Sequence, residues 1–220
     1  MISFFKILSV WIFLFLLSCN INFSPRETDG FTPEAQVFVD MIMDENPGAS
    51  YDVNIVEAAS SFGFINPVGY VLGIIVENRV ILTNTIDSLR NNGTYRFEKA
   101  SYGDGRGMVD LNFCGIKIKC SNLDSIEIRT DSVIVLPSLS LSDCNLTHLP
   151  PEIGKIRTEG LDLNYNNLKE LPLEIMSVFD HLSPGTGHIK IQGNPIANDY
   201  WSNLPDTMRN WIKANQGSNY

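Results

Sequence analysis

The sequence is poor in the residues on which small stapled folds, metal sites and nucleic-acid sites depend. Four cysteines in 220 residues are too few for a disulfide scaffold. The three histidines, His148, His181 and His188, include no pair with the spacing of a helical zinc motif. Sixteen Lys and Arg are outnumbered by 25 Asp and Glu, which gives a net charge of −9. We therefore expect no metal, no cofactor and no nucleic-acid partner, since nucleic-acid binding requires clustered cations.

The chain also lacks an apolar run of the roughly 20 residues that a membrane span requires. Its first apolar run, residues 7–17, is broken by Ser9 and follows a single cation, Lys6. A cation followed by a short apolar run is typical of a secretory signal peptide. The sequence therefore predicts export, with residues 1–18 as the signal.

The end of this signal resembles the lipobox of bacterial lipoproteins, because residues 16–19 read Leu-Leu-Ser-Cys. The resemblance implies cleavage before Cys19 and acylation of that residue, and several acyl chains make a durable anchor. By the same resemblance, Asn20 favours sorting to the outer membrane. Residues 19–30 are polar and read as a flexible tether. An ordinary cleaved signal and an uncleaved anchor are the alternatives.

The second half of the chain contains a repeat. Residues 139–156 and 161–178 align without gaps at an offset of 22 residues, and they share the pattern L-x-L-x-x-(N/C)-x-L-x-x-L-P-x-E-I. Similar starts occur at Ile189 and Val109, and a weaker one at Val80. In the L-x-L part, alternate residues point the same way, so each repeat predicts a short strand with its leucines inward.

This pattern resembles the bacterial form of the leucine-rich repeat family. The resemblance implies an α/β solenoid in which a short parallel sheet lines the concave face. An ordinary sandwich of amphipathic strands is the alternative. An inward Asn or Cys after each strand can pair backbone groups of neighbouring turns. We expect this structural ladder position to be occupied by Cys114, Cys144, Asn166 and Asn194.

A solenoid needs terminal elements that cover its core. Thr32 followed by Pro33 predicts a helix start, and Leu204-Pro205 opens a second amphipathic helix. The expected organisation has four parts after the signal peptide. These are the tether (19–30), an N-terminal cap segment (31–78), leucine-rich repeats (79–197, clearest at 139–196) and a C-terminal helical cap (198–220).

The residues and motifs that could carry reactive or ligand-binding chemistry are expected to have structural roles in this sequence. The Gly-rich run 103–107 lacks the strand and helix of a phosphate-binding loop and is expected to be a turn. Cys114 and Cys144 are expected to be neighbours with parallel side chains, which disfavours a disulfide. No catalytic set stands in a recognisable motif. We therefore predict a protein that is not an enzyme.

The resemblance implies that macromolecules bind to outward side chains of the concave face. Phe113 and Tyr165 are expected to share one column there, flanked by acidic residues. The predicted partner is therefore neutral or basic. The expected partner-binding residues are Asp110, Asn112, Phe113, Asp143, Asp162, Asn164, Tyr165, Lys190 and Gln192.

Together these features predict a lipid-anchored recognition module of the bacterial cell envelope that binds another protein or a glycan. Two other classes of function stay open. One is an envelope enzyme with an unrecognised active site in residues 50–108. The other is a purely structural envelope lipoprotein. A concave pocket with convergent polar groups would favour the enzyme.

Overall fold

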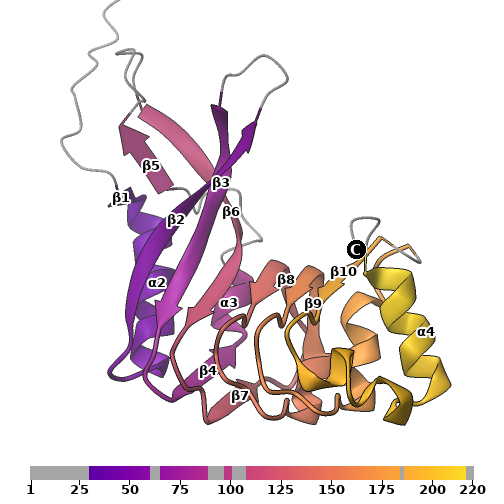
Figure 1. Cartoon of the computed structure of the whole chain (residues 1–220). Helices are drawn as coiled ribbons and strands as arrows, with labels where there is room; N and C mark the ends of the chain where they lie inside the picture. The colour runs from indigo at the N-terminus through magenta and orange to yellow at the C-terminus, as the bar shows by residue number, and fades with distance from the viewer. Residues whose placement is uncertain (1–29, 60–64, 89–96, 101–107, 184–185, 217–220) are drawn as a thin grey trace, which may run out of the picture.

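The computed structural model describes residues 30–59, 65–88, 97–100, 108–183 and 186–216 (Figure 1). The predicted signal peptide, Cys19, most of the tether and the Gly-rich run 103–107 lie outside these residues. Among the helices in the described part of the chain, none has the length and apolarity to cross a membrane.

The first helix, α2 (Pro33–Glu45), begins where the sequence predicted. Thr32 is its N-cap, and the Thr32 hydroxyl accepts a hydrogen bond from the N–H of Ala35 at 3.4 Å. The helix ends at Asn46, whose buried side chain reaches strand β4 (Arg79–Thr83). There Asn46 Oδ1 accepts from the N–H of Ile81 at 2.7 Å and Nδ2 donates to the Ile81 carbonyl at 3.0 Å. This amide fixes α2 against β4.

The main sheet has eight strands of mixed direction (Figure 1). Its central path runs β1-β5-β6-β8-β9-β10, and β3 joins β6 with β2 beside it. The pairs β1/β5, β5/β6 and β2/β3 are antiparallel, whereas β3/β6, β6/β8, β8/β9 and β9/β10 are parallel. The strands are β1 (Gly30–Phe31), β2 (Ser50–Ala59), β3 (Ile65–Ile75), β5 (Phe97–Ala100), β6 (Met108–Lys119), β8 (Ile134–Ser140), β9 (Ile156–Asp162) and β10 (His188–Lys190).

A second layer completes the core. It contains β4 paired in parallel with β7 (Ser125–Arg129). At the C-terminal end of the described chain, the helix α4 (Asp206–Asn215) follows the predicted Leu204-Pro205 start. Met208 and Ile212 of α4 are fully buried. The shorter helical segments are α3 (Thr85–Ser88), η1 (Pro151–Lys155), η2 (Leu173–Phe179), η3 (Pro195–Ala197) and η4 (Trp201–Asn203).

The predicted fold class, a leucine-rich repeat solenoid with helical N-terminal and C-terminal caps, is wrong. The described residues form an α/β structure with three α-helices and a mixed sheet, in which antiparallel strands take up much of the N-terminal half. The strand near Val80, expected to start the repeats, leaves this sheet and pairs with β7. Alternating apolar residues indicate a strand, but they do not determine which strand it pairs with or in which direction.

The alignment of residues 109–116 with the later repeats is also wrong. It placed Val109 beside Leu139, whereas Ile116 is the residue that pairs with Leu139. β6 is irregular just before this pairing: Gly115 has φ +143°, and the pairing with β3 skips one residue between Phe113 and Gly115. The backbone and hydroxyl of Ser138 lie so close to Gly115 that a side chain there would collide with them. A bulge of this kind changes which residues face outward along the rest of the strand.

Candidate functional site

Three parallel strands bring predicted binding residues into register. Ser140 of β8 pairs with Asp162 of β9, which pairs with Lys190 of β10. Two residues further along the chain, Asn164 Oδ1 accepts a hydrogen bond from the N–H of Gln192 at 2.8 Å. The hydroxyls of Ser140 and Ser142 lie 3.2 Å apart. We call this surface the outer face, and it comprises Ser140, Ser142, Asp143, Asp162, Asn164, Tyr165, Lys190 and Gln192.

The turns that follow these strands share one unusual backbone conformation. Asp143, Tyr165 and Gly193 hold equivalent positions with φ values of 59°, 55° and 74°. Asp143 donates its N–H to the Asn164 carbonyl at 3.1 Å, and Tyr165 donates to the Gln192 carbonyl at 2.8 Å. Asp and Gly enter this left-handed region readily, but a bulky residue such as tyrosine is strained there.

Tyr165 is the exposed aromatic residue of the outer face, with 56% of its surface accessible. Its ring lies over Gly193, and a Cβ at that glycine would come within 2.6 Å of Tyr165 Cδ1. Gly193 therefore serves two purposes, because it allows the positive φ and leaves room for the ring. The opposite side of the ring is open to a partner.

Phe113 does not share the column of Tyr165, which corrects the predicted pair of aromatic anchors. It lies on β6 before the bulge and is half-buried, with its ring centroid 5.7 Å from that of the buried Tyr70. The side chains of Asp110 and Asn112 lie outside the described residues.

The corrected register instead places Lys117 beside Ser140. Lys119, two residues further along β6, is paired with Asp52 and lies 3.4 Å from the side-chain oxygen of Asn54. Neither lysine is among the predicted binding residues, although the alternation Ile-Lys-Ile-Lys at 116–119 indicates outward-facing lysines. They make the surroundings of the outer face less acidic than the sequence suggested.

The two predicted ladder asparagines lie beneath the outer face and are buried. Asn166 Oδ1 accepts hydrogen bonds from the N–H groups of Cys144 at 3.1 Å and Leu146 at 3.0 Å. Asn194 Oδ1 accepts from the N–H of Leu168 at 3.0 Å. The Nδ2 atoms of both asparagines donate to carbonyls of the same turn and the adjacent turn. These bonds tie each turn to the next and make the outer face a rigid support.

The predicted ladder cysteines behave differently from each other. Cys114 lies in the bulged part of β6, where its carbonyl accepts from the Ser138 hydroxyl at 2.8 Å and burial raises the pKa of its thiol. Cys144 is fully buried, and its neighbour is Cys120 rather than Cys114. Because the two thiols interact, the pKa of Cys144 is lowered and that of Cys120 is raised.

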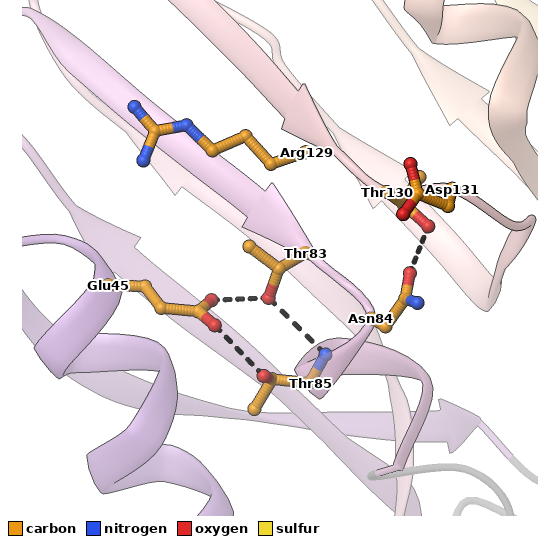
Figure 2. A pocket seen from close by; sticks show the side chains of 7 residues that line it. All are labelled: Glu45, Thr83, Asn84, Thr85, Arg129, Thr130 and Asp131. Carbon is orange, nitrogen blue, oxygen red and sulfur yellow. Dashed lines mark hydrogen bonds between the residues drawn. The ribbon is translucent and has the colours of Figure 1, made fainter.

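A cavity of about 540 Å³ opens at the carboxyl ends of β4 and β7 (Figure 2). Part of its lining belongs to the 50–108 stretch in which an active site was considered. Figure 2 shows the Glu45 carboxylate accepting from the hydroxyls of Thr83 and Thr85, the latter at 3.0 Å. Thr130 donates to Asn84 on the other side. Glu45, Thr83 and Thr85 thus bind one another and join α2 to β4 and α3, whereas the Arg129 guanidinium pairs with Glu127.

Within the described ranges, no group of three or more His, Cys, Asp or Glu side chains is arranged to hold a metal ion. Comparison of the chain with protein-family models, curated proteins and solved structures finds no match. The geometry of the outer face is therefore the basis for inferring a function.

Proposed function

We propose that the protein is an exported, lipid-anchored recognition module of the cell envelope that binds another protein through the outer face. The observation that carries the proposal is Tyr165, a largely exposed aromatic residue held in a strained backbone conformation. Strained residues that persist in a fold are found disproportionately at functional sites. Tyrosine is also among the residues that most often dominate the energy of protein interfaces.

The support beneath Tyr165 favours binding. Its ring lies over Gly193, and the buried amide of the next residue, Asn166, bonds to two consecutive turns. A side chain that is already held in place loses little conformational entropy when a partner binds. The outer face is therefore preorganised for recognition.

The charges around Tyr165 favour a partner with little net charge. Asp143 and Asp162 are matched by Lys190 on the outer face and by Lys117 beside it. Alternating signs at this spacing give orientation and specificity more than affinity. This modifies the sequence-based expectation, which extended to a basic partner.

The order of the strands is consistent with anchoring through residues before Gly30. The described chain begins with β1, which lies at one end of the central path, whereas β10 lies at the other end. A lipid on Cys19 would therefore attach the protein at the end of the sheet opposite β10. The outer face would then be directed away from the anchored end.

The test begins with the full chain isolated from membranes and used to capture partners from envelope and host extracts. We expect Tyr165→Ala to weaken binding of the captured partner by at least about 30-fold. Asn167→Ala, an exposed neighbour outside the outer face, is the matched control and should bind normally. Isothermal titration of the partner into each variant measures both affinities.

A second variant separates binding from folding. Tyr165→Asn should also lose binding, but it should unfold at a higher temperature than wild type because asparagine tolerates the left-handed region. Unchanged affinity in a folded Tyr165→Ala protein would contradict the proposed site. Binding to glycans alone would contradict a protein partner.

A further inference from the structure

Two thiols meet at the junction between the strands β6 and β8. Cys120 follows the end of β6, and Cys144 lies in the turn after β8. The carbonyl of Cys144 accepts from the N–H of Leu123 at 2.9 Å, and its sulfur lies 3.6 Å from the Ile118 carbonyl. These two contacts fall on residues on either side of Cys120 and place it beside Cys144. Adjacent strands are about 4.8 Å apart, within the Cα range of disulfides.

We propose that Cys120 and Cys144 form a disulfide in the exported protein. The inference rests on the proposed function for the oxidising compartment, since disulfides persist outside the cytosol. The bond would close the loop that contains β7 and β8. It would also fix the turn that carries Asp143 of the outer face.

The reaction is a thiol–disulfide exchange with an external disulfide as oxidant. Half-buried Cys120 loses its proton to solvent and attacks the external disulfide, which forms a mixed disulfide and releases one thiolate. The Cys144 thiolate then attacks Cys120 Sγ and releases the second thiolate. The two protein thiols lose two electrons and two protons, and the oxidant is reduced to two thiols.

Accessibility determines which sulfur reacts first. Cys120 is partly accessible to a donor, whereas Cys144 is fully buried and can be reached by Cys120. Cys114 is the bulge residue of β6, between the paired residues Phe113 and Gly115, and provides an internal comparison.

The experiment equilibrates the full chain in mixtures of reduced and oxidised glutathione, quenches with acid and alkylates with N-ethylmaleimide. Intact mass should show two fewer maleimide additions in oxidising mixtures than in reducing ones. Peptide mapping should find Cys120 joined to Cys144, with Cys114 alkylated. Oxidation should raise the thermal midpoint by about 6–12 °C.

The serine variants distinguish the pair from general oxidation. Cys120→Ser should abolish both the mass change and the thermal shift, whereas Cys114→Ser should retain both. Cys144→Ser should give the same result as Cys120→Ser, but it changes a fully buried residue and can prevent folding. Cys120 is only half-buried, so Cys120→Ser tests the pair even if Cys144→Ser does not fold. Full alkylation in excess oxidised glutathione, or a bond that includes Cys114, would overturn the proposal.

Quenching intact cells with acid fixes the redox state of the cysteines and tests separately whether the protein is exported to an oxidising compartment. A bond that forms in glutathione buffers and is also present in trapped cells supports both proposals. A bond that forms in buffer while trapped cells contain reduced thiols supports the pair and contradicts export to an oxidising compartment.

Discussion

Five backbone groups converge on the side-chain amide of Asn166. Two N–H groups donate to its oxygen, and its nitrogen donates to the carbonyls of Leu141, Leu163 and Asn164. All belong to the turns after β8 and β9, the same turns that hold Asp143 and Tyr165 in their left-handed conformation. At the scale of the residue, the geometry of the outer face therefore depends on one buried amide.

Replacing Asn166 with alanine should lower the free energy of unfolding by about 2–3 kcal/mol, because buried backbone groups lose their partners. Asn167→Ala changes an exposed neighbour and should cost much less. Urea unfolding followed by circular dichroism measures both. Equal midpoints for the two variants would show that the Asn166 side chain has no such structural role.

Strands β1, β2, β3 and β6 are held together by an aromatic cluster. Tyr70 of β3 is fully buried, and its ring centroid lies 5.6 Å from that of Phe31 and 5.7 Å from that of Phe113. Phe31 in turn lies 5.9 Å from Tyr51 of β2. Burial raises the pKa of Tyr70 above its ordinary value of 10.0, with a smaller contribution from the nearby Cys114 thiolate. This group of strands is therefore sensitive to alkaline pH.

We expect the folded protein to lose stability as the pH rises above about 10. Tyr70 stays neutral in the folded state, whereas in the unfolded chain it ionises, so unfolding releases a proton. The contribution of Tyr70 to the free energy of unfolding is fully present below the pKa that Tyr70 has in the unfolded chain. Above that pH it falls by up to about 1.4 kcal/mol per pH unit. Tyr70→Phe should flatten this decline, and Tyr165→Phe at an exposed site should not. Urea melts between pH 8 and about 11 provide the measurement.

The sequence predicted some elements well and others poorly, for reasons that β6 makes clear. The starts of α2 and α4, the register of β8, β9 and β10, and the buried positions of Asn166 and Asn194 could be inferred from local signals. The partners of β6 could not, because antiparallel pairing with β5 and parallel pairing with β3 are long-range choices. Phe113 and Cys114 left their expected columns because β8 pairs with β6 at Ile116 rather than at Val109.

The whole molecule has the proposed attachment point at one end of its sheet path and the outer face toward the other. Attachment depends on the sequence signal before Gly30. We expect mature protein extracted from membranes to begin at Cys19 and to carry added acyl mass, because residues 16–19 resemble a lipobox. Intact mass spectrometry checks this, with Cys19→Ser as the control that should appear in the soluble fraction or retain its signal peptide. Unmodified wild-type protein that begins elsewhere would contradict the lipid anchor.

The position of β6 also determines how the protein would carry a mechanical load. A partner held at the outer face and a lipid held in a membrane would pull on opposite ends of the sheet, and the tension would pass through β6. Seven residue pairs join β6 to β3, but two pairs, Ile116 with Leu139 and Lys117 with Ser140, join it to β8. The β6/β8 junction is therefore one of the two narrowest on this path, together with β1/β5, which is also joined by two pairs. A bond between Cys120 and Cys144 would lie next to the β6/β8 junction, where a covalent link would increase the force that this junction withstands.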